Sequence, residues 1–92
     1  MEEKKYEVTY KIELFTVNGS VKPDGFNSIE FIRKGDENIT IAQSIELDSD
    51  TPSFEFINRP MEVIKTNFDY KFAGGGSSPK LIVIKTYYER II

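Results

Sequence analysis

The chain has 92 residues and a formal net charge of −3, and it contains neither histidine nor cysteine. The missing imidazole and thiol groups exclude the commonest general base, the usual zinc ligands and the familiar nucleophile pairings, and the scattered lysines and arginines form no basic patch for nucleic acid. We therefore expect one domain, residues 1–92, that is not an enzyme, carries no cofactor and binds no nucleic acid.

The first residues carry charge and do not form an apolar leader. Residues 1–5 lead directly into a strand pattern, so we expect no signal peptide and synthesis in the cytoplasm. No apolar run approaches the roughly 20 residues that a membrane-spanning helix needs. We therefore expect no contact with a membrane.

The first strand is predicted over residues 5–17, where polar and apolar side chains alternate. The apolar members share one face, and they are Tyr6, Val8, Tyr10, Ile12 and Leu14. Alternation with period two is typical of a strand with one buried face, so we expect this row to point into the core. Phe15 and Val17 then fall on the opposite, polar face, which indicates a bulge, a bend or a patch that another surface covers.

The rest of the chain is predicted to form short strands separated by turns. A loop at residues 18–25 is rich in Asn, Gly, Ser, Pro and Asp, which favour tight turns. Further strands are predicted at residues 28–34, 39–47, 54–56, 61–72 and 80–92, with a flexible glycine-serine loop at residues 73–79. The last strand is apolar on both faces at residues 81–84, which indicates a central strand or one between two layers.

Strands separated by turns at short intervals, without helical spacing, indicate an all-β protein. We expect an antiparallel β-sandwich, jelly-roll-like or immunoglobulin-like, of about six to eight strands. Because cysteine is absent, packing and not disulfide bonds must hold this fold together.

Aromatic and aliphatic residues outside the alternating core set are the candidate interface residues, because interface centres are enriched in such side chains. They are Phe15, Val17, Tyr87, Tyr88, Ile91 and Ile92. Apolar residues at a chain end, here Ile91 and Ile92, usually fray into solvent unless another surface packs against them. Either the first strand of the same chain or a second protein could provide that surface. Both explanations stay open at this point.

The strand sequences follow a recognisable order along the chain. They are Ser28–Gly35, Ile39–Ile41, Ile45–Leu47, Ile64–Phe72 and Lys80–Lys85. This order resembles small β-sandwich virion accessory proteins of tailed bacteriophages that infect Bacteroidetes. The resemblance implies a structural protein that decorates a capsid, joins a fibre to a head or belongs to a tail assembly.

The leading hypothesis is therefore a non-catalytic virion structural protein that acts through protein–protein contacts. Its partners would be other copies of itself, as a homo-oligomer, and other virion proteins, and it would reside in the virion after synthesis in the host cytoplasm. The alternative is a small carbohydrate-binding or adhesive β-sandwich, in which Tyr87 or Tyr88 stacks on sugar rings. A small acidic protein that binds and inhibits a host enzyme is the third possibility.

Overall fold

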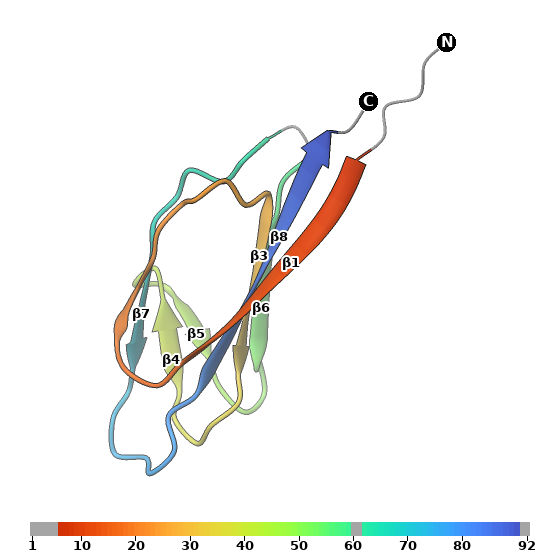
Figure 1. The fold of residues 1–92 in the computed structure, drawn as a ribbon. Helices are drawn as coiled ribbons and strands as arrows, with labels where there is room; N and C mark the ends of the chain where they lie inside the picture. Colours follow the sequence, from red (N-terminus) through yellow and green to blue (C-terminus); the bar gives the residue numbers. More distant parts are fainter. Residues whose placement is uncertain (1–5, 60–61, 91–92) are drawn as a thin grey trace.

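The computed structural model describes residues 6–59 and 62–90, and within them the chain forms strands and turns but no helix. The eight strands are β1 (Tyr6–Phe15), β2 (Gly19–Val21), β3 (Ser28–Arg33), β4 (Ile39–Ile41), β5 (Ile45–Leu47), β6 (Ser53–Ile57), β7 (Phe68–Phe72) and β8 (Leu81–Arg90) (Figure 1). In this described part, nothing helical is long and apolar enough to cross a membrane. The predicted all-β fold is confirmed.

The strands form two antiparallel sheets of four strands each, with the orders β1-β8-β3-β6 and β2-β7-β4-β5. The first strand therefore lies beside the last, the second beside the second-last, and so on inward to the pair β4 and β5. A strand ladder folded on itself in this way is a jelly roll. The sandwich is thus of the jelly-roll type, and its order places β1 at an edge of the first sheet (Figure 1).

The two sheets enclose an apolar core, to which alternate residues of the strands and two residues outside them, Phe26 and Ile64, contribute. The buried aliphatic and aromatic side chains of the core are Val21, Phe26, Ile29, Phe31, Ile39, Ile41, Leu47, Ile64, Phe68, Tyr70, Phe72, Leu81 and Val83. Burial alternates strictly along β7 and along the first half of β8, as the period of two in a strand requires. The alternation predicted from residue 68 to residue 72 is therefore confirmed.

Three predicted elements differ from the structure. Residues 39–47 form two strands with a turn between them, and not one strand. In the described part of the predicted strand 61–72, only β7 is a strand, because Ile64 bonds the Phe26 carbonyl instead of a neighbouring strand. Gly19–Val21, predicted as part of a loop, pairs with β7 as β2.

The turn between β4 and β5 contains two strained residues. Ala42 and Gln43 have positive φ angles of 52° and 65°, and the Ser44 N–H donates to the Ile41 carbonyl at 3.2 Å. Two consecutive left-handed residues are typical of a type I′ hairpin turn, which favours Asn and Gly. Because the left-handed conformation costs a residue with a Cβ roughly 1 kcal/mol or more, this turn destabilises the fold.

Asn27 joins the start of β3 to the end of β8 and to the segment after β6. Its buried side chain accepts the Tyr88 N–H at 3.0 Å through Oδ1 and donates to the Glu62 carbonyl at 3.0 Å through Nδ2. Its backbone N–H donates to the Thr86 carbonyl at 2.8 Å. Asn27 therefore holds one edge of β8 beyond the first residue of β3.

Replacing Gln43 with glycine should stabilise the protein. Gln43→Gly removes the Cβ that disfavours a φ of 65°, and we expect the free energy of unfolding in urea to rise by about 0.5 to 1 kcal/mol. Gln43→Ala keeps a Cβ and is the control, which should gain nothing. Equal stabilities for the two variants would contradict the proposed strain.

Candidate functional site

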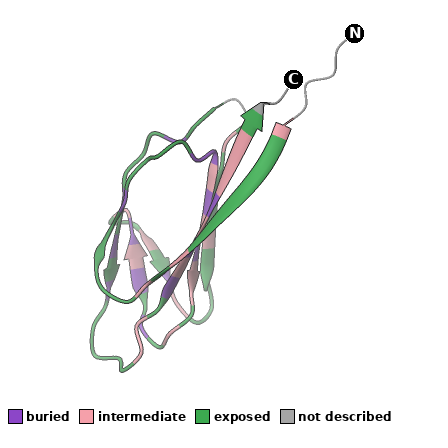
Figure 2. Ribbon diagram, viewed as in Figure 1, coloured by how far each residue is buried: buried purple, intermediate pink, exposed green. Residues whose placement is uncertain are grey.

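The first strand turns its apolar row toward solvent. The even-numbered side chains of β1 are largely exposed: Val8 39%, Tyr10 67%, Ile12 68% and Leu14 59%. Figure 2 shows β1 exposed over most of its length. The prediction that this row points into the core is therefore wrong. On the odd-numbered row, Glu13 and Phe15 are partly buried, and the Phe15 ring lies 5.0 Å from that of Tyr70 in the second sheet.

An ion-pair network around the buried Lys85 explains this orientation. Lys85 is only 6% exposed, and its Nζ lies 2.8 Å from Glu13 Oε1 and 3.2 Å from Asp24 Oδ2. A buried ammonium group is tolerated only when carboxylates pair with it. Because side chains alternate along a strand, placing Glu13 beside Lys85 places Ile12 and Leu14 on the outside.

Tyr87 and Phe26 complete the network around Lys85. The Tyr87 hydroxyl donates to Asp24 Oδ1 at 2.9 Å, and Lys85 Nζ lies 5.6 Å from the centre of the Phe26 ring. Burial opposes ionisation of Asp24, but the hydrogen bonds from Tyr87 and Lys85 and the Lys85 charge outweigh it and lower the Asp24 pKa. Burial also opposes charge on Lys85, but Glu13 and Asp24 outweigh it and raise the Lys85 pKa. Lys85 therefore stays a charged ammonium group at neutral pH and stabilises the fold.

The outward rows of β1 and β8 form one contiguous apolar surface. The register places Ile12 opposite Ile84 and Leu14 opposite Ile82. We call this surface the apolar strip, and its members are Val8, Tyr10, Ile12, Leu14, Ile82 and Ile84. Because contiguous exposed apolar surface marks contact sites, the apolar strip is the candidate binding surface.

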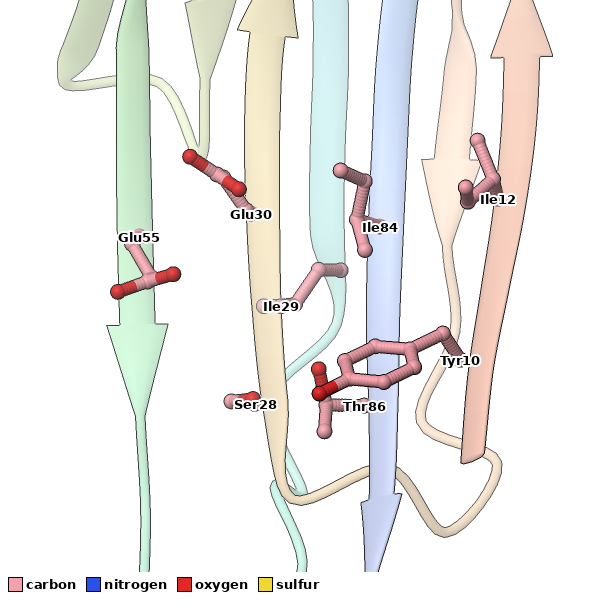
Figure 3. Close-up of a pocket in the computed structure, with 8 residues that line it drawn as sticks. All are labelled: Tyr10, Ile12, Ser28, Ile29, Glu30, Glu55, Ile84 and Thr86. Carbon is pink, nitrogen blue, oxygen red and sulfur yellow. The ribbon is translucent and has the colours of Figure 1, made fainter. Parts of the chain in front are cut away.

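A shallow depression of about 340 Å³ borders the apolar strip on the same face of the sheet (Figure 3). Tyr10 and Ile84 lie at its apolar side, and the Tyr10 ring extends from β1 across β8 toward Thr86. Glu30 of β3 and Glu55 of β6 line the other side. The depression therefore combines an aromatic ring, the hydroxyl groups of Ser28 and Thr86, and two carboxylates.

Two of the predicted interface residues lie on the inner side of the sheet. Phe15 packs against the core at the end of β1. Tyr87 also packs against the core, with its ring 6.5 Å from that of Phe26. Their side chains thus contribute to the sandwich itself.

The other predicted interface residues do not gather in one place. Val17 is 71% exposed in the loop after β1. Tyr88 lies opposite Val8 in the register and shares its outward row. Ile91 and Ile92 lie outside the described residues.

The apolar strip is the feature that sequence reasoning missed. One signal for it is the apolar character of Leu81–Ile84 on both faces, although only Leu81 and Val83 belong to the core. A strand that is apolar on both faces indicates a cover on both faces. β8 is central in its sheet, as predicted, but the described chain covers only its inner face.

Comparisons with protein-family models, with curated proteins and with solved structures found no match to this chain. Within residues 6–59 and 62–90, no group of three histidine, cysteine, aspartate or glutamate side chains could hold a metal ion. The candidate site therefore depends on the geometry of one sheet face, which carries the apolar strip and the depression beside it.

Removing the Tyr87 hydroxyl should weaken the network and reduce the loss of folding stability at alkaline pH. Burial and the Asp24 carboxylate raise the Tyr87 pKa from its ordinary 10.0 to about 12. The folded state holds this proton more tightly, so the stabilisation is complete below about pH 10 and is lost as the pH rises toward 12. We expect Tyr87→Phe to lower the free energy of unfolding near pH 7 by about 1 kcal/mol in urea titrations, and to lose less stability above about pH 10 than wild type does.

Tyr88→Phe is the matched control, because Tyr88 lies on the opposite face of the same strand. It should keep the wild-type decline in alkali. Some decline should remain in Tyr87→Phe, because the raised Lys85 pKa also gives stabilisation that is lost at high pH. Identical alkaline declines in wild type and Tyr87→Phe would contradict the role of Tyr87 in the network.

Proposed function

We propose that the protein is a non-catalytic structural protein that acts through protein–protein contacts and self-association on its outer sheet face. The observation that carries this proposal is the apolar strip, in which Tyr10 and Ile12 are 67% and 68% exposed. Covering apolar surface contributes roughly 25 cal/mol per Å². A partner that covers the strip therefore gains binding free energy without any change in the domain.

A virion is the setting that we propose for this activity. Viral capsid proteins use jelly rolls, and the strand patterns resemble virion accessory proteins of tailed bacteriophages. One fold serves many functions, so this support is by analogy, whereas the apolar strip supports contact function directly. The partners would be further copies of the chain and other virion proteins, in capsid decoration, head-fibre joining or tail assembly.

A charge on the apolar strip should weaken self-association through the strip without unfolding the domain. Ile12→Lys places an ammonium group in the middle of the strip, and we expect light scattering to show a smaller species for the variant than for wild type. Because Ile12 is 68% exposed, the free energy of unfolding should change by less than about 1 kcal/mol.

Val63→Lys is the matched control, because Val63 is an exposed aliphatic residue outside both sheets. This variant should stay oligomeric. Wild-type protein that is monomeric at high concentration and does not cosediment with virion particles would contradict the proposal.

Carbohydrate binding is a second candidate, which the depression beside the strip favours. Sugar rings stack on aromatic faces, and their hydroxyl groups bond to carboxylates. Tyr10, Glu30 and Glu55 supply these groups around one depression. Tyr10 replaces Tyr87 as the stacking candidate, because Tyr87 points toward the core.

A glycan array separates the two candidates. The structural proposal predicts that wild type and Tyr10→Ala give the same background signal on every glycan. A glycan that wild type binds and Tyr10→Ala does not bind would instead establish the carbohydrate-binding candidate.

A further inference from the structure

β1 has a free hydrogen-bonding edge. It lies at the end of the sheet order, so its backbone groups on the side away from β8 pair with no other strand of the described chain. The opposite edge of β8, in contrast, has Asn27 bonded to the Tyr88 N–H beyond the start of β3. A long free edge beside exposed apolar side chains is a template for the addition of another strand.

We propose that two copies of the chain pair through β1, edge to edge and antiparallel, about a two-fold axis at Thr9. This inference rests on the proposed function and names its partner as a second copy. Residues 6–12 of each copy would pair, with Glu7 opposite Lys11 of the second copy and Val8 opposite its Tyr10. The two sheets would become one continuous sheet, and both apolar strips would lie on the same face.

Charge restricts the register of this pair. A symmetric antiparallel pair is defined by the residue that lies opposite its own copy. Centring the pair on Lys11 or on Glu13 places like charges opposite each other, and centring it on Tyr10 places Glu7 opposite Glu13. Because like charges directly opposite destabilise paired strands and opposite charges stabilise them, these registers are disfavoured.

Among the residues of β1, only the centres at Thr9 and Ile12 place Lys11 opposite a glutamate. The centre at Ile12 uses Glu13, which already forms an ion pair with Lys85 of its own chain. The centre at Thr9 uses Glu7, which is exposed and has no ion pair with another described residue. Charge complementarity therefore favours the pair centred on Thr9.

The shape of the first sheet favours the same centre. Residues 6–9 of β1 pair with residues 87–90 of β8 beyond Ser28, where β3 begins, and Figure 1 shows these two strands projecting past the others. A ribbon of two strands is only marginally stable in water. Pairing about Thr9 places this ribbon beside its copy, so that two strands become four. Pairing about Ile12 leaves residues 6–8 with no opposite residue in β1 of the second copy.

A single introduced cysteine tests the register, because the natural chain has none. In the proposed pair, the Cβ atoms of Thr9 and its copy are about 5 Å apart, close to the geometry of a disulfide. With a mild oxidant, we expect Thr9→Cys to form a covalent dimer at least about tenfold faster than Ile12→Cys. Thr66→Cys, at an exposed position outside the strands, is the control for random collision.

Exchange of two charges is a second test that needs no cysteine chemistry. Lys11→Glu and Glu7→Lys each place like charges opposite each other twice in the dimer. We expect either variant to raise the Kd of self-association about tenfold in sedimentation experiments. The double variant Glu7→Lys/Lys11→Glu exchanges the charges and should restore the wild-type Kd to within about twofold.

Two results would overturn this register. Faster cross-linking of Ile12→Cys than of Thr9→Cys would show that the two copies pair in another register. Failure of the double variant to restore association would show that Glu7 and Lys11 do not lie opposite each other in the dimer. If wild type is nevertheless an oligomer that Ile12→Lys dissociates, the proposed function stands and only the register fails. A monomeric wild type that does not cosediment with virion particles would contradict both the proposed function and the proposed dimer.

Discussion

The ion pairs of Lys85 with Glu13 and Asp24 fix which face of β1 points into the sandwich. The apolar outer surface of the sheet is a consequence of this orientation. Lys85 is buried, so turning Glu13 away would remove one of the two carboxylates that compensate its charge and would destabilise the fold. A slip of one residue would turn Glu13 away from Lys85 and would also withdraw Phe15 from the core. The apolar residues of β1 are therefore held on the outside.

The jelly-roll order gives this orientation a second consequence. Because the first strand pairs only with the last, β1 lies at a sheet edge and carries both an exposed apolar row and free backbone groups. Native proteins usually protect such edges with charges, bulges or a covering segment. Glu7 and Lys11 are the charged residues of this edge strand that form no ion pair with another described residue, and their opposite signs favour one pairing between copies while opposing others.

The strands could be predicted from the sequence more completely than their orientation. Period-two alternation identifies β1, β3 and β7, but it defines two faces without saying which is buried. For β1 the decision comes from Lys85, far along the chain, so no local pattern contains it. The turn at Ala42 and Gln43 was missed because it lacks the Asn and Gly that usually mark a type I′ turn. Because β1 has the opposite orientation to the predicted one, the candidate surface consists of its outward row and does not include Phe15 and Tyr87.

The most direct test of this account is methyl NMR of dilute, monomeric full-length protein with a soluble paramagnetic agent, which relaxes nuclei at the surface. The account predicts strong relaxation of the Ile12 and Leu14 methyl groups and little relaxation of those of Ile41 and Leu47, which are fully buried. Ile12 and Leu14 methyl groups as protected as that of Leu47 would show that β1 turns its apolar row inward, and would contradict the account.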